Sequence, residues 1–191
     1  MLIKICFVII ISSTIFLSIQ YFFNTKQLIG VPETLSVYTN PVQGVEIAYP
    51  KKYVRSTLTT EDTQAGIFFR ITRDVPAAMF SIRYQKGFGA MKLLGGSTLE
   101  TFTEEVNRRY PERFPEYKKE RYERIVLANE NAVLIEFSYL GKDNVTRIKQ
   151  RLIFFIHNNA AYFLSSQAKV EDFNVIEKEF TKIVGSFAFL D

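Results

Sequence analysis

Cysteine, histidine and tryptophan are almost missing from this chain of 191 residues, which has one cysteine, one histidine and no tryptophan. A lone cysteine cannot form an intramolecular disulfide, and together with a lone histidine it offers no set of zinc ligands. A strong charge bias is also missing, since 24 basic residues stand against 20 acidic ones. We therefore expect no metal site, no cofactor and no nucleic acid partner.

A catalytic signature is missing as well. His157 is the single histidine, and a general base there would need a nucleophile and an orienting acid, which no local motif supplies. The sequence therefore predicts a protein that is not an enzyme. An enzyme stays open as an alternative only if His157 meets a carboxylate or a hydroxyl inside a cleft.

What the chain has is a long apolar run at its start. No residue from Ile5 to Thr25 is charged, and most are isoleucine, phenylalanine, leucine or valine. A helix over this run is about 30 Å long, which matches the hydrocarbon core of a bilayer. We predict an uncleaved transmembrane signal anchor over residues 1–25. A cleaved signal peptide is the alternative, but its apolar core is usually shorter and ends in small residues, unlike Gln20-Tyr21-Phe22-Phe23.

The location of the remaining chain follows from this anchor. A short N-terminus followed by a large C-terminal domain usually leads to translocation of that domain. We therefore expect a single-pass protein of the cell membrane whose C-terminal domain lies outside the cytoplasm. Residues 26–36, which include Gly30 and Pro32, are predicted to be a tether. Hydrophobic residues make up 47% of the chain, so residues 37–191 have enough apolar content for one globular domain.

Short alternating strands dominate the predicted domain, and turn residues separate them. Asn158-Asn159, for example, suits a tight hairpin, because asparagine tolerates positive φ. The fold class is therefore α+β, with successive hairpins that predict an antiparallel meander. The expected strands cover residues 45–49, 67–73, 78–85, 122–127, 133–140, 146–156 and 161–165.

Two helices are expected beside the sheet. The first begins at a capping box, Ser97-Thr98-Leu99-Glu100, and Pro111 is expected to end it after Tyr110. The second is an amphipathic helix near the C-terminus that should lie across the sheet. Its large apolar side chains are three or four positions apart and form one stripe: Phe173, Ile176, Phe180, Ile183 and Phe187.

Both ends of this domain carry patterns of a known family. The first part has Gly44 before the alternating segment Val45-Glu46-Ile47-Ala48, then Tyr49-Pro50 and the aromatic Tyr53. The last part has Ala161-Tyr162-Phe163-Leu164, followed by Phe180, Ile183, Ser186 and Phe187. Together they resemble the opening and the close of the PsbP-like family, named for a photosystem II extrinsic protein. The chain is similar to a divergent bacterial-type member over residues 35–189.

This resemblance implies an α-β-α sandwich, in which helices flank an antiparallel sheet. It also implies a non-enzymatic role, because members bind or help to assemble larger complexes, often at membranes. The residues of the ion-retaining members have no match here, so neither a metal site nor a tie to photosynthesis is implied. The function expected is therefore protein binding or complex assembly at a membrane, with an unidentified protein partner.

The segment from Arg108 to Arg124 is the candidate partner-binding surface. Aromatic and arginine side chains are enriched in binding hot spots. The alternative is an ordinary solvated linker, because Glu112, Glu116 and Glu120 are interspersed. Two apolar residues of a glycine-rich loop join the candidates. The full set is Arg108, Arg109, Tyr110, Arg113, Tyr117, Lys118, Lys119, Arg121, Phe88 and Met91.

A second function stays open at this point, a small-ligand or lipid-binding module. It would use a pocket between the sheet and the C-terminal helix, lined by residues such as Phe154, Phe163 and Phe180. We also expect a chain that begins near Leu35 to be soluble and monomeric, because the apolar run is then gone.

Overall fold

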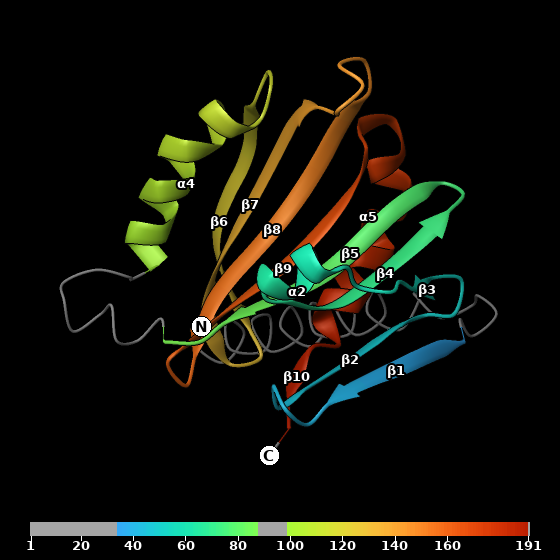
Figure 1. Cartoon of the computed structure of the whole chain (residues 1–191), viewed down its shortest axis with the longest axis vertical. Coiled ribbons are helices and arrows are strands. Elements are labelled where there is room, and N and C mark those ends of the chain that lie inside the picture. The colour runs from blue at the N-terminus through green and yellow to red at the C-terminus, as the bar shows by residue number, and fades with distance from the viewer. Residues whose placement is uncertain (1–33, 88–98, 191) are drawn as a thin grey trace, which may run out of the picture. The chain divides into compact units, whose positions relative to one another are not determined.

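The computed structural model describes residues 34–87 and 99–190. They form a three-stranded sheet, a seven-stranded sheet and helices (Figure 1). The elements in chain order are β1 (Leu35–Asn40), β2 (Val45–Pro50), β3 (Val54–Arg55), α2 (Thr60–Gln64), β4 (Ile67–Asp74), β5 (Ala77–Gln85), α4 (Leu99–Arg113), β6 (Lys118–Leu127), β7 (Glu130–Leu140), β8 (Arg147–His157), β9 (Ala160–Lys169), α5 (Val170–Gly185) and β10 (Ala188–Phe189).

The predicted membrane anchor, residues 1–25, lies outside the described residues. Phe88 and Met91 lie outside them too. Among the helices that are described, none has the length and apolar character needed to cross a membrane. The predicted tether, residues 26–36, overlaps the domain at its end, because β1 already begins at Leu35 and pairs with β2.

The seven-stranded sheet has the order β3-β4-β5-β9-β8-β7-β6, and every neighbouring pair is antiparallel. β6 to β9 form the meander that the sequence predicts. Asn158 and Asn159 turn the β8–β9 hairpin with φ of 46° and 62°, the left-handed conformation that asparagine tolerates. The meander does not continue through the whole sheet, because β9 pairs on its other side with β5.

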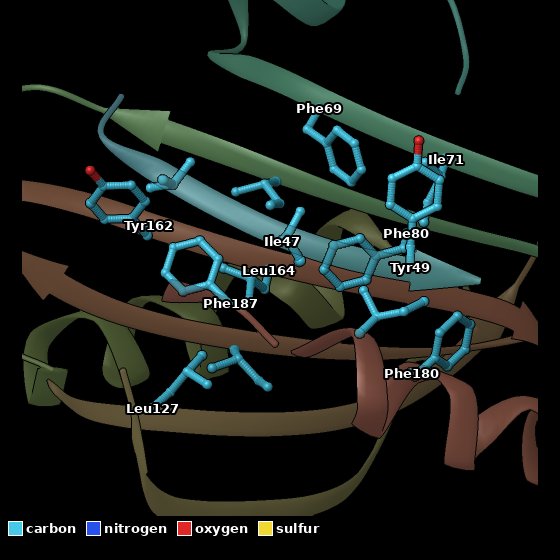
Figure 2. Close-up of a cluster of buried hydrophobic side chains, with 14 of the residues drawn as sticks. Ile47, Tyr49, Phe69, Ile71, Phe80, Leu127, Tyr162, Leu164, Phe180 and Phe187 are labelled. Carbon is cyan, nitrogen blue, oxygen red and sulfur yellow. The ribbon is translucent and has the colours of Figure 1, made fainter. Parts of the chain in front are cut away.

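One face of this sheet packs against α5 and the small sheet. Side chains alternate along β8, so Ile153 and Phe155 point to this face and Leu152 and Phe154 to the opposite one. The α5 stripe is buried here, as predicted, and Phe180 lies within the cluster (Figure 2). Each such side chain contributes about 1.5–3 kcal/mol of hydrophobic free energy. Phe187 also belongs to this core, but it follows the end of α5 instead of forming part of it.

The opposite face is covered by α4. Phe102 stacks on Phe154 with 3.9 Å between ring centroids, and Val106 is the helix residue that is buried. The sheet therefore has α4 on one face and α5 on the other, so helices flank it as the family resemblance implies (Figure 1).

The prediction that Pro111 ends the first helix is wrong. α4 continues to Arg113, and Phe114 N donates to Tyr110 O at 2.9 Å. Proline lacks an N–H, so only one intrahelical bond is lost at this position. Tyr110 and Phe114 pack against Phe137 with centroid distances of 5.2 and 5.4 Å, and these contacts hold the last turn in place.

Other differences from the sequence prediction concern short or polar elements. β1, α2, β3 and β10 were not expected; α2 is one short helix with a capping box between Thr59 and Asp62. β6 begins at Lys118 instead of Tyr122. The sequence does not show this start, because an edge strand can be polar on both faces and then has no alternating pattern. β9 continues past Ser165 to Lys169, where α5 follows directly.

Candidate functional site

The predicted surface segment, Arg108 to Arg124, covers the end of α4 and the first part of β6. Most of its aromatic side chains point inward, although Tyr122 is 40% exposed. Tyr110 and Tyr117 pack on Phe137, with centroid distances of 5.2 and 5.4 Å. Burial raises the pKa of both tyrosines. These two candidates therefore hold α4 on the sheet and present little surface to a partner.

Most basic candidates of this segment have partners within the domain. Arg108 and Arg109 both pair with Glu105, at 2.9 Å for Arg108. Further partners are Glu123 for Arg121 at 2.7 Å, Glu100 for Arg124 at 2.9 Å, and Asn107 for Lys119 at 3.1 Å. Exposed pairs of this kind contribute little to stability and leave a neutralised surface.

Arg113 differs from these residues. Its guanidinium lies over the ring of Phe114, 5.7 Å from the centroid, and it pairs with no carboxylate of the described residues. It also lines a cleft. Lys118 is exposed at the start of β6.

The cleft beside Arg113 has a volume of about 680 Å³. The last turn of α4 and the following Phe114 and Pro115 form one side, and the end of β7 with the β7–β8 loop forms the other. Most of the lining surface is carbon. Tyr139 forms part of the wall, and burial raises the pKa of its hydroxyl. Lys142 adds a second cation.

A second cleft of about 450 Å³ adjoins the first. Thr146, Ile148 and Gln167 line both, so the two form one groove, which we call the cross-sheet groove. It extends from the end of α4 over β8 and β9 to the β4–β5 hairpin, where Met79 contributes to the lining. The groove lies on the α4 face, because Ile148 alternates in phase with Leu152 and Phe154.

The β7–β8 loop is held by a compact set of hydrogen bonds. The Asp143 carboxylate accepts from Val145 N at 3.0 Å, from Thr146 N at 2.9 Å and from Thr146 Oγ1 at 2.5 Å. These bonds lower the pKa of Asp143 to about 2. Gly141 N also donates to Thr146 O at 2.8 Å. The one carboxylate of this wall is thus engaged inside its own loop.

Arg83 is a third cation on the same face. It follows Met79 on the same side of β5 and lies 3.7 Å from the centroid of the Phe163 ring. Burial lowers the pKa of Arg83, and the charge of the nearby Arg113 lowers it further, against the effect of Tyr110. Removing a cation partly from water is costly without a partner. Arg83 is half-buried, and in the described part of the chain no carboxylate pairs with it.

The α5 face has a buried ion cluster instead. Glu136 and Arg151 are both 5% exposed, and Arg151 Nε donates to Glu136 Oε1 at 2.7 Å. Arg151 also donates to Glu177 at 2.5 Å, and Lys149 Nζ lies 3.1 Å from Glu136. Burial alone would raise the pKa of Glu136, but these cations outweigh it and lower the pKa. The cluster is saturated and serves the packing of α5.

His157 lies at the β8–β9 turn, where it lines a cleft of about 280 Å³. Its Nδ1 is 2.8 Å from Glu130 Oε1, its Nε2 is 2.9 Å from Asn158 Nδ2, and its ring stacks on Phe189 at 3.6 Å. The enzyme alternative required a carboxylate near this histidine, and Glu130 provides one. Both ring nitrogens are occupied, however, and the hydroxyl of Tyr162 in this cleft donates to Gln43 O.

The predicted ligand pocket between sheet and C-terminal helix is not formed by the residues expected. Phe154 and Phe163 point to the α4 face, whereas Phe180 lies in the core on the α5 face. The sheet itself separates Phe154 and Phe163 from Phe180, so these three side chains cannot line one pocket. In the described ranges, no cluster of histidine, cysteine, aspartate or glutamate could hold a metal ion.

The groove was not visible from the sequence. Tyr139, Lys142, Ile148 and Gln167 were not candidates, because they come together only when β7, β8 and β9 pair. The turn residues from Gly141 to Asn144 predict a loop, but they do not show that this loop forms one wall of the groove. Arg113 was the one link, since it was already part of the candidate segment.

Comparisons with known proteins place this fold. No protein-family model and no curated protein sequence matches the chain. Among solved structures it is similar to CyanoP, the cyanobacterial PsbP of Synechocystis sp. PCC 6803, with a TM-score of 0.57, 12% identity and coverage of 85% of this chain and 95% of that chain. LpqN, described as involved in cell envelope biogenesis of Mycobacterium tuberculosis, gives 0.51, 9%, 85% and 88%.

A third similar structure is a Pseudomonas aeruginosa protein of unknown function, with a TM-score of 0.52, 11% identity, and coverage of 80% of this chain and 94% of that chain. At such low identities the likeness shows the fold alone. The fold is a mostly antiparallel β-sheet domain with a few helices, of the PsbP-like α+β type, which confirms the predicted fold class.

Proposed function

We propose that this protein is a non-catalytic binding subunit that is held at the cell membrane by residues 1–25 and presents its folded domain outside the cytoplasm to a protein partner. We also propose that it is a divergent member of the PsbP-like family. The apolar, uncharged run from Ile5 to Thr25 supports the anchor. The similarity of the fold to CyanoP and to LpqN supports the family and the setting.

The cross-sheet groove is the observation that carries this proposal. It combines carbon-rich walls with the arginine and lysine charges of Arg113 and Lys142. Arginine next to aromatic and aliphatic surface is the composition of binding hot spots. The groove is also open along the sheet, so it suits a segment of a macromolecule.

A site-specific photo-cross-linker tests this function. It replaces Lys142 at the groove in one full-length variant and Val175 in the other, since Val175 is 67% exposed on the outer side of α5. After irradiation of intact cells, we expect a discrete protein adduct from position 142 and none from position 175. Adducts of equal yield from both positions, or none from position 142, would contradict a partner in the groove.

A further inference from the structure

Two of the three described arginines that pair with no carboxylate lie near the groove; the third, Arg55, lies over the ring of Tyr38. Most described arginines pair with a carboxylate, as Arg73 does with Glu179 at 2.7 Å. In the two described ranges, the guanidinium groups of Arg83 and Arg113 pair with no carboxylate and lie over the rings of Phe163 and Phe114. The two charges lie close enough for Arg113 to lower the pKa of Arg83. Like charges held together without an acid favour an anionic ligand.

The groove also provides unused hydrogen-bonding groups at its middle. Gln167 lines both clefts, and its side-chain amide has no hydrogen-bond partner among the described residues. Beside it on β8, Gln150 donates instead to Ser165 Oγ at 2.7 Å. A side-chain amide offers both donors and an acceptor, the set that matches a peptide group of an extended chain.

Apolar side chains lie next to these polar groups. Phe114, Tyr139 and Ile148 line the same cleft as Arg113 and Lys142. A ligand that fills this cleft therefore meets carbon surface on its walls and positive charge at its end. Asp143 does not cancel that charge, since its carboxylate is bound within the loop.

From this arrangement we infer that the cross-sheet groove binds an extended, acidic segment of the protein partner, with an apolar side chain against the contacting rings of Phe114 and Tyr139 and a carboxylate on Arg113, near which Arg83 adds a second positive charge. This inference rests on the proposed function and specifies the partner's chemistry. The Arg113 guanidinium would bind the carboxylate with paired N–H donors. Gln167 would bind the backbone of the segment.

Synthetic peptides test the charge preference directly. The probes are a fluorescent peptide of alternating glutamate and phenylalanine and its counterpart with glutamine in place of glutamate. Fluorescence anisotropy with the full-length chain in detergent micelles gives both affinities. A hydrogen bond to a charged group is stronger than one between neutral groups. We therefore expect the glutamate peptide to bind at least about tenfold more tightly, with an advantage that falls as salt rises.

Arginine variants assign the preference to the groove. Arg113→Gln should remove most of the tenfold advantage, and Arg113→Lys should restore part of it because the charge returns without the paired donors. Arg83→Lys, which keeps the charge, should cause a smaller loss. Arg124→Gln is the matched control, since Arg124 is exposed and pairs with Glu100; it should change nothing.

The outcomes separate this inference from the proposed function. Equal binding of the two peptides, or an equal loss in Arg113→Gln and Arg124→Gln, would overturn the acidic preference. Binding of phosphatidylglycerol vesicles through Arg113 without binding of the peptide would also overturn it in favour of a lipid headgroup. If position 142 still gives its protein adduct in Arg113→Gln, the partner site stands and only the charge preference fails. If position 142 gives no adduct in the parent chain, the proposed function itself fails.

Discussion

The two faces of the seven-stranded sheet are covered in different ways. On the α5 face, the helix buries Phe173, Ile176, Phe180 and Ile183 completely or almost so, and the buried charges pair with one another. On the α4 face, the helix buries Val106, while Arg83 has no carboxylate partner in the described chain. The helix on the α5 face is therefore the more deeply buried of the two, although the α4 face also has a buried core. The proposed binding role rests on the unpaired arginine charge of the α4 face.

The largest expected effect comes from the α5 core. Phe180→Ala should lower the free energy of unfolding by about 3–5 kcal/mol, because it removes a fully buried ring. Phe102→Ala on α4 should cost less, about 1–2 kcal/mol, since Phe102 is only partly buried. Urea unfolding of a chain that begins at Leu35 measures both. Equal losses would show that the two faces contribute alike.

The ion cluster on the α5 face should give a smaller, pH-dependent effect. Glu136→Gln removes the carboxylate that Arg151 and Lys149 share, and Glu177 remains as a partner. We expect a loss of about 2 kcal/mol near neutral pH. The pKa of Glu136 is lowered in the folded state, so its contribution is present above the usual carboxyl range and is lost as the pH falls through the lowered pKa.

Urea unfolding over a range of pH checks this sign. The parent chain should lose stability on acidification more steeply than Glu136→Gln, because the variant no longer binds that proton. Glu171→Gln is the control, since Glu171 is exposed and lies 3.9 Å from Lys169. If Glu136→Gln and the parent show the same pH dependence, the pairing of Glu136 does not stabilise the fold.

The smallest expected effect is local to the groove wall. Asp143→Asn weakens the bonds that hold the β7–β8 loop, so the amide hydrogens of Val145 and Thr146 should exchange faster while the strands stay protected. In the parent, this protection should persist on acidification until the pH approaches about 2, where Asp143 gains its proton. Hydrogen exchange by mass spectrometry detects the change. Unchanged exchange in the variant would mean that the loop is held by other contacts.

Elements with a strong local signal could be predicted from the sequence. The stripe from Phe173 to Ile183 gave α5 and the face that it buries, and Asn158-Asn159 gave the β8–β9 hairpin. β1 and α2 have no such signal, since β1 is stabilised by pairing with β2 and α2 is one short turn of polar residues. The end of α4 was predicted too early at Pro111, because the packing of Tyr110 and Phe114 on Phe137 outweighs one missing hydrogen bond.

The site was harder to predict than the fold. Tyr110 and Tyr117 have the composition of a binding surface, but they face the sheet, and sequence composition does not show which way a side chain points. Lys142 and Gln167 lie far apart in the chain and meet at the groove only through the β7-β8-β9 pairing. Arg113 belongs both to the segment predicted from the sequence and to the groove, because the end of α4 forms one wall of the groove.

Hydrogen exchange on the full-length protein, alone and in complex with its cross-linked partner, tests the central claim most directly. The account predicts added protection along Tyr139–Ile148, which forms one wall and part of the floor of the groove, and no change along α5. Added protection confined to α5, or none along Tyr139–Ile148, would contradict it.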